Sequence, residues 1–228
     1  FGVRVENGKT FYDNSREYIF QAVEASLKRL NRDYIDLYQV HYRDGKTPLA
    51  DVAESLEILK DQGKIRYYGL SNIHAEDAEE LKQFDKNPFV SFQDEYSLAC
   101  RKNEADMFRF RDECEMTPFT WGSLGQGILS GKYDKNCKFD ANDRRSRDIY
   151  VNFHGEKLLK NLEIVEVLKE IAGETGKSVS SVAIRWILDY LKESVVIVGA
   201  KTPKQVLQNA ESLSFKLTDE QIYRLENI

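Results

Sequence analysis

The sequence predicts an α/β fold in which parallel strands alternate with amphipathic helices. Runs of strand length that are rich in β-branched and aromatic residues alternate with segments whose apolar residues recur at helical spacing. Polar side chains end several of these runs, above all His41 after the apolar run 35–40, and the carboxyl ends of barrel strands carry active sites. No GxGxxG motif follows a strand, which disfavours the classical dinucleotide-binding sheet. A doubly wound sheet and part of a (β/α)8 barrel both fit the pattern, and we favour the barrel although only five strands are countable.

The first half of the chain supplies three strands, each followed by a helix. Asn14 and Glu17 predict a capping box for a helix over about 15–30, with apolar residues on one face. Thr47 followed by Pro48 predicts the start of a second helix, with proline in its first turn. The elements expected around this helix are strands at 35–42, 65–72 and 89–96 and helices at about 75–84 and 103–114.

The second half supplies two more strands and a long irregular segment. Pro118 to Trp121 predicts a short strand, and residues 131–154 form a charged loop of a length that is usually functional or disordered. Two helices with apolar faces at 158–171 and 182–188 precede a strand at 195–198. The last two helices are predicted from caps at Thr202 with Pro203 and at Thr218 with Gln221.

Length and composition limit the possible functions. The 228 residues suit one domain spanning 1–228, and 41% hydrophobic with 31% charged residues is typical of a soluble globular protein. A net charge of −5 disfavours nucleic acid and anionic membranes as partners. No apolar run approaches the roughly 20 residues of a membrane span, and no secretory signal begins the chain. The three cysteines lack metal-ligand spacing, so we expect reduced thiols, no metal and a cytoplasmic location.

An anion site is predicted after the last strand. Gly199 lets the backbone approach a ligand closely, Lys201 supplies a cation, and Thr202 opens a helix whose first N–H groups favour negative charge. Phosphate sites after the last strands are frequent in barrels.

Five segments, in this order and spacing, resemble the aldo-keto reductase family, especially its prokaryotic-type members related to the potassium-channel β-subunit. The matching segments are residues 36–41, 63–72, 93–97, 124–133 and 198–201. The resemblance implies a (β/α)8 barrel whose first strands are absent from this chain, with Phe1 and Gly2 at the end of the third strand. It also implies an NADPH-dependent reduction of an aldehyde or ketone.

Of the catalytic Asp, Tyr, Lys and His that the resemblance implies, only the histidine is matched, by His41. In the family, tyrosine supplies a proton while a hydride passes to the carbonyl carbon, and His41 would orient the carbonyl. We therefore expect the other three residues upstream, this segment alone to be inactive, and a missing segment or partner chain to be needed to close the barrel. Tyr42 and Arg43 replace the Trp-Pro pair that often follows the family histidine.

The resemblance assigns a larger set of residues to the cofactor. Amide and hydroxyl groups would hold the nicotinamide carboxamide, an indole would stack on the nicotinamide ring, and a glycine-containing loop would follow the pyrophosphate. Cations near the adenosine end favour NADPH over NADH. In order along the cofactor, these residues are Ser71, Asn72 and Gln93; Trp121; Gly122, Ser123, Leu124, Gln126 and Lys132; and Arg145, Gly199, Lys201, Gln205 and Asn209.

Each of these residues alone also has a structural interpretation. A strand-end histidine is more often structural than catalytic, Ser71 and Asn72 can start a turn, and Trp121 can belong to the core. Two functional alternatives stay open. One is a regulatory or sensor subunit that binds the nicotinamide cofactor, and the other is an inactive truncated homologue.

Overall fold

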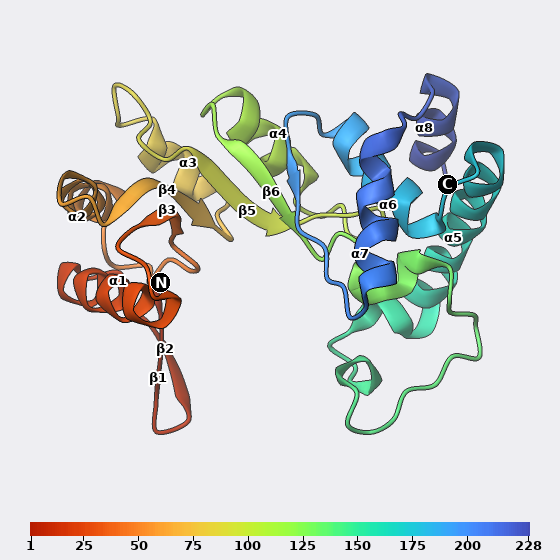
Figure 1. The fold of residues 1–228 in the computed structure, drawn as a ribbon, viewed down its shortest axis with the longest axis horizontal. Coiled ribbons are helices and arrows are strands. Elements are labelled where there is room, and N and C mark those ends of the chain that lie inside the picture. The colour runs from red at the N-terminus through yellow and green to blue at the C-terminus, as the bar shows by residue number, and fades with distance from the viewer. The chain divides into compact units, whose positions relative to one another are not determined.

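Helices and parallel strands alternate along residues 1–228, all of which the computed structural model describes (Figure 1). Five strands form one sheet in which each new strand is added beside the previous one. The pairings of the first three strands are parallel, which confirms the predicted α/β class. In sheet order the strands are β3 (Ile35–Gln39), β4 (Ile65–Ser71), β5 (Ser91–Glu95), β6 (Thr117–Trp121) and β7 (Val195–Val196).

The residues divide into two compact units. The first unit comprises Phe1–Asp94 and Ala105–Phe119, and the second comprises Glu95–Glu104 and Thr120–Ile228. The chain passes from the first unit to the second within β5, returns after the first residue of α4, and passes to the second unit again within β6.

A β-hairpin that the sequence analysis did not predict begins the first unit. Strands β1 (Val3–Glu6) and β2 (Lys9–Tyr12) pair antiparallel and form a separate two-stranded sheet, drawn in dark red in Figure 1. Asn7 and Gly8 between them have φ values of 50° and 75°. Asn-Gly is the preferred sequence for a two-residue hairpin turn with positive φ, so the signal was present in the sequence.

The helices of the first unit are α1 (Arg16–Leu30), α2 (Leu49–Asp61), α3 (Ala75–Leu81) and most of α4 (Glu104–Asp112). The predicted cap of α1 was wrong by one residue, because the Ser15 hydroxyl accepts a hydrogen bond from the Tyr18 N–H. Asn14 is instead fully buried and bonds to the loop after β3. Pro48 is the N-cap residue of α2 and does not lie in its first turn.

Two strands are shorter than predicted because their pairing ends early. β3 ends at Gln39, after which the Val40 N–H still donates to the Gly69 carbonyl oxygen over 2.9 Å. β7 contains two residues, and one further hydrogen bond joins the Ile197 N–H to the Thr120 carbonyl oxygen at 2.9 Å. The polar residues that follow these strands therefore belong to loops.

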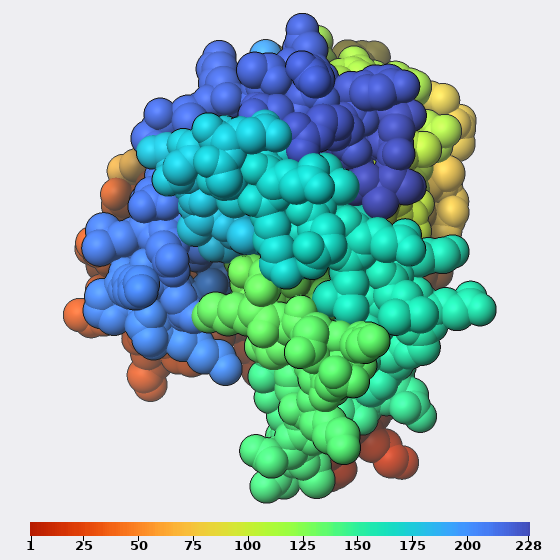
Figure 2. All heavy atoms as spheres, turned by 90° about the vertical axis from the view of Figure 1, so that its right-hand side faces the viewer, coloured from red at the N-terminus to blue at the C-terminus, as the bar shows by residue number.

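Helices dominate the second unit. Figure 2 shows its exterior, where α5 (teal to cyan) lies between α8 (dark blue) and the loop that follows β6 (green). The caps predicted at Thr202 and at Thr218 with Gln221 are confirmed. The helices and single 3₁₀ turns are η1 (Gly125–Ser130), η2 (Arg144–Ser146), η3 (Val151–Phe153), α5 (Gly155–Thr175), α6 (Val179–Tyr190), α7 (Pro203–Ala210), η4 (Glu211–Ser214) and α8 (Asp219–Glu226).

A buried tryptophan ties α6 to α8. The Trp186 ring stacks on Tyr96 at a centroid distance of 5.6 Å, and its Nε1–H donates to the Glu226 carboxylate at 2.8 Å. Arg101 donates to the other oxygen of the same carboxylate over 2.8 Å. The carboxyl-terminal helix is therefore fixed by a charge-assisted network as well as by apolar packing. No helix of the chain has both the length and the apolarity needed to cross a membrane.

Candidate functional site

His41 lies two residues beyond β3 with both of its backbone polar groups bonded. Its N–H donates to the Phe1 carbonyl oxygen over 2.7 Å, and its carbonyl oxygen accepts from the Asn72 side-chain amide at 2.9 Å. Partial burial lowers the pKa of His41. The exposed imidazole is therefore neutral at pH 7, where one ring nitrogen can donate a hydrogen bond.

The residues predicted to hold the nicotinamide carboxamide come together at the ends of β4 and β5. The Ser71 hydroxyl donates to the Gln93 carbonyl oxygen over 2.9 Å, and the Asn72 N–H donates to the same oxygen over 2.8 Å. The Asn72 side chain also donates to the Ser71 hydroxyl over 3.1 Å. The first unit thus joins Ser71, Asn72 and Gln93 to His41 in one hydrogen-bonded group.

The strand register explains this convergence. Ser71 is paired with Gln93 across the parallel strands β4 and β5. The preceding pair, Leu70 and Phe92, is buried and fixes which side of the two strands packs against the helices. Gly69 allows the close approach, because a Cβ there would lie 2.2 Å from the Ser91 hydroxyl oxygen. Asn72 adopts a φ of 52°, a left-handed conformation that asparagine tolerates better than most residues.

A cavity of about 680 Å³ opens in the second unit between the loop after β6, the segment after β7 and α7. Its volume lies in the range of small-molecule and cofactor sites. Every residue predicted to contact the pyrophosphate or the adenosine lines this cavity, whereas Trp121 does not line it. The predicted lining residues are Gly122, Ser123, Leu124, Gln126, Lys132, Arg145, Gly199, Lys201, Gln205 and Asn209.

Several lining residues were missed by the sequence analysis. Tyr133 ends one of the segments that resemble the family, and Asp143 lies two residues before Arg145, so the sequence held a signal for both. Ser178 and Ser180 precede and begin α6, and no pattern in the sequence distinguishes them from ordinary helix-start residues.

Glycines and one glutamine shape the segment that runs from the end of β6 into η1. Gly122, Gly125, Gln126 and Gly127 all have positive φ values, of 66°, 54°, 55° and 104°. The Gln126 side chain is bonded at both ends, since it donates to Glu95 over 3.2 Å and accepts from Asn152 over 2.5 Å. We therefore expect Gln126 to meet a ligand through its backbone.

Ser123 holds the ends of two strands together. Ser123 is 2% exposed, and its hydroxyl donates to the Ile197 carbonyl oxygen over 3.0 Å and lies 3.0 Å from the Thr120 hydroxyl. This fixes the loop after β6 against the segment after β7, which together border the cavity.

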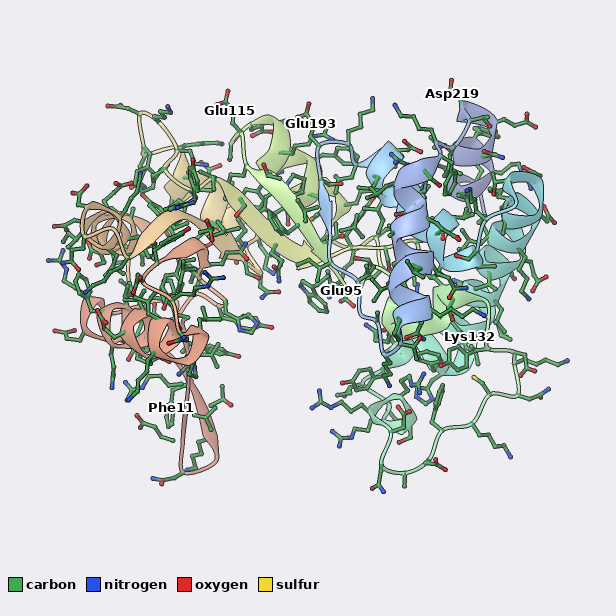
Figure 3. The ribbon with its side chains drawn as sticks, in the orientation of Figure 1. Phe11, Glu95, Glu115, Lys132, Glu193 and Asp219 are labelled. Atoms are coloured by element: carbon green, nitrogen blue, oxygen red, sulfur yellow. The ribbon has the colours of Figure 1, made fainter.

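The cavity lining is cationic. Lys132, Arg145 and Lys201 line it together with one carboxylate, that of Asp143. Hydrogen bonds from Arg145 lower the pKa of Asp143 well below its ordinary value. Lys132 is one of the residues labelled in Figure 3. Since Asp143 compensates only one of three positive charges, the cavity is suited to an anionic ligand.

Arg145 is already engaged within the chain. Its Nε donates to Asp143 over 2.9 Å, a second nitrogen donates to the Tyr133 hydroxyl, and its guanidinium lies 4.3 Å from the centroid of the Phe139 ring. These contacts order the loop at one wall of the cavity. The ammonium groups of Lys132 and Lys201 have no ion-pair partner, so they are the cations free to meet an anion.

Helix α7 supports the segment after β7 through two residues that were predicted to contact the cofactor. The Gln205 side-chain oxygen accepts from the Lys201 N–H over 2.6 Å, and Asn209 donates to the Gly199 carbonyl oxygen over 3.4 Å. Thr202 caps the helix at the same end. The first N–H groups of the helix thus lie beside Lys201, as an anion site requires.

The chain belongs to the Aldo/keto reductase family, whose sequence profile matches residues 3–228. It is 34% identical over 216 residues to "Aldo-keto reductase YhdN" of Bacillus subtilis, which covers 94% of this chain and 64% of the relative. It is 31% identical over 217 residues to "Aldo-keto reductase yakc [NADP(+)]" of Schizosaccharomyces pombe, covering 94% of this chain and 63% of that protein. The chain therefore spans a little less than two thirds of the length of these curated relatives.

A solved structure gives the same result for the fold. The glycerol dehydrogenase AKR11B4 from Gluconobacter oxydans matches all of this chain with a TM-score of 0.89 and 31% identity, and the match covers 69% of that chain. The aldo-keto reductase AKR11C1 from Bacillus halodurans matches 99% of this chain with a TM-score of 0.75 and 29% identity, covering 70% of that chain.

Proposed function

We propose that the protein containing this chain is an NADPH-dependent oxidoreductase that reduces an aldehyde or ketone to an alcohol. The observation that carries the proposal is the cationic cavity of about 680 Å³ bordered by the glycine-containing loop and by α7. Its residues fit a dinucleotide, because free ammonium groups and helix N–H groups suit phosphate and the cavity volume suits a cofactor.

Lys132 and Lys201 would bind the phosphates, and the backbone of the loop after β6 would lie along them. The Gln93 and Asn72 amides and the Ser71 hydroxyl would hold the carboxamide, since amides pair donor to acceptor. A bound reduced nicotinamide would supply the hydride for the carbonyl carbon.

His41 would orient the substrate. Its neutral imidazole can donate a hydrogen bond to the carbonyl oxygen, and two hydrogen bonds hold the backbone of His41 in place. We assign the proton itself to the Tyr of the Asp, Tyr and Lys set, which the matched motifs of this chain do not include. By this proposal residues 1–228 alone do not turn over carbonyls. We also propose that a further strand, from a longer chain or from a partner chain, pairs with the outer edge of β3, which has one strand neighbour.

The preference for NADPH follows from Lys201, an unpaired cation that lies beside the start of α7. Relatives carry both preferences in their names, as "Aldo-keto reductase yakc [NADP(+)]" and an Escherichia coli "NADH-specific methylglyoxal reductase" show. Calorimetric titration of the full-length protein with NADPH and NADH tests the proposal. We expect NADPH to bind more tightly than NADH. If neither cofactor binds, the assignment as a reductase is wrong.

A second candidate function is a regulatory subunit that senses the cofactor. It is favoured by 31% identity over 222 residues to a "Probable voltage-gated potassium channel subunit beta" of Oryza sativa, covering 94% of this chain and 67% of that protein. Such a subunit would bind NADPH with ordinary affinity while reducing common carbonyls negligibly. Steady-state turnover of the full-length protein therefore separates the two candidates.

A further inference from the structure

Three aromatic rings from two segments of the first unit lie in series beside the proposed carbonyl site. The Tyr42 ring centroid is 4.8 Å from that of His41, and the Tyr12 ring at the end of β2 is 5.3 Å from that of Tyr42. Tyr12 is 52% exposed and Tyr42 is 36% exposed. The rings therefore present apolar surface next to the imidazole, where a substrate side group would lie.

Buried asparagine hydrogen bonds hold Tyr12 in this position. Two residues after Tyr12, the fully buried Asn14 donates from its side chain to the Tyr42 carbonyl oxygen over 3.1 Å. Its N–H donates to the Asp44 carboxylate over 2.9 Å, and the Asp44 N–H donates back to the Asn14 side-chain oxygen over 2.8 Å. A satisfied buried network of this kind fixes geometry, so the end of β2 cannot move independently of the loop after His41.

The other end of the hairpin is fixed as well. Gly2 has a φ of 97°, and a Cβ there would lie 2.7 Å from the Tyr42 carbonyl oxygen. The Tyr18 hydroxyl on α1 donates to the Val3 carbonyl oxygen over 2.8 Å. The hairpin base is thus attached to both the loop after β3 and α1, and its position is fixed.

Neighbouring residues of β2 face opposite sides of the hairpin. Because side chains alternate along a strand, Phe11 faces away from the side on which Tyr12 meets Tyr42. Phe11, labelled in Figure 3, is 46% exposed. It provides a matched control of similar exposure and size.

We propose that Tyr12 and Tyr42 form an aromatic wall of the substrate site and select carbonyl compounds that carry an aromatic ring. This inference rests on the proposed carbonyl reductase function. Aromatic rings in offset or edge-to-face contact gain affinity beyond that of buried area, which predicts a preference of about three- to tenfold for an aryl over a saturated ring. Tyr12 and Tyr42 act through their ring faces, so the hydroxyl groups are dispensable.

The test compares kcat/KM of the full-length protein for benzaldehyde and for cyclohexanecarbaldehyde. Tyr12→Leu and Tyr42→Leu should each lower the ratio of the two values by about three- to tenfold, while Tyr12→Phe and Phe11→Leu should preserve it. NADPH affinity should stay unchanged in all four variants. An unchanged ratio in both leucine variants would overturn the inference while leaving the reductase assignment intact.

A binding measurement tests the inference even if the unmodified protein does not turn over a carbonyl substrate. Benzyl alcohol should shift NMR resonances of the Tyr12 and His41 rings, and cyclohexylmethanol should do so at about three- to tenfold higher concentration. Equal responses to the two alcohols, or shifts confined to Phe11, would contradict the aromatic wall. Absence of NADPH binding would contradict the reductase function separately.

Discussion

The side-chain amide of Asn72 donates a hydrogen bond to the carbonyl oxygen of His41 over 2.9 Å, although 31 residues separate them in the chain. Asn72 follows β4 and His41 follows β3, so this bond joins the ends of two neighbouring strands. The same amide reaches the Ser71 hydroxyl, which bonds to β5. A proposed cofactor contact and a proposed carbonyl contact are thereby parts of one structure.

Replacement of Asn72 should separate its two contributions to that structure. Asn72→Gly removes the side-chain bond but permits the φ of 52°, so we expect a loss of about 1 kcal/mol of unfolding free energy. Asn72→Ala removes the bond and also strains the backbone, which should cost about 1–2 kcal/mol more. Urea denaturation of both variants measures the difference. If the alanine variant is no less stable than the glycine variant, the left-handed conformation is not what selects asparagine here.

The Asp44 carboxylate predicts how the loop after His41 responds to acid. Burial opposes its ionisation, but N–H groups of Thr47, Asn14 and Lys46 and the Thr47 hydroxyl outweigh this and lower the pKa of Asp44 to about 2. A depressed carboxylate pKa stabilises the folded state above the unfolded value near 4 and loses that effect as pH falls toward 2.

Asp44→Asn should therefore be about 1–2 kcal/mol less stable than the unmodified protein at pH 7. The difference in unfolding free energy should shrink between pH 4 and pH 2. Asp36→Asn is a suitable control, because Asp36 lies on an exposed site and pairs with the exposed Arg66. A difference that does not depend on pH would show that the loop needs the shape of the side chain and not its charge.

The sequence allowed the fold class and the cavity lining to be predicted for a physical reason. Strand and helix periodicity is a local property, and the motifs of the glycine-containing loop and of the segment after β7 lie at strand ends, which a parallel sheet brings to one edge. Gln126 and Arg145 line the cavity as predicted, but the structure shows their side chains bonded to Asn152 and Asp143. Those pairings depend on side-chain packing across a long loop, which no periodicity encodes.

The role of Asn14 escaped prediction for a related reason, whereas the hairpin does leave a local signal in Asn7-Gly8. Asn14 matches the capping-box pattern with Glu17, whereas Ser15 is followed three residues later by Tyr18. What decided between them was Asp44, 30 residues away, which bonds to the Asn14 backbone. Long-range competition for a polar side chain leaves no signal in a local window.

Lys201 should contribute to cofactor binding through its charge. Lys201→Gln removes one unpaired cation from the cavity, and we expect NADPH affinity to fall by roughly tenfold, with a smaller loss for NADH. Lys169→Gln makes the same charge change on α5, where the lysine pairs with exposed Glu166 away from the cavity. The loss of NADPH affinity in Lys201→Gln should be smaller at 500 mM salt than at 50 mM salt, since salt screens exposed charges. Lys169→Gln should not change NADPH affinity at either salt concentration. Equal weakening of NADPH and NADH would argue against a 2′-phosphate contact.

Protonation of His41 should destabilise the folded protein in mildly acidic solution. Partial burial lowers the pKa of this imidazole below its ordinary value near 6.5, so the unfolded chain takes up the proton first as pH falls. For a histidine whose folded pKa is depressed, stability is complete above the unfolded pKa and declines as pH falls from about 7 through the folded value. Proton NMR should locate the titration of His41 below the ordinary histidine value near 6.5, and His41→Gln should remove the corresponding slope in unfolding free energy. A titration of His41 at or above the ordinary histidine value near 6.5 would mean that the ring is not neutral where the proposed carbonyl contact requires it.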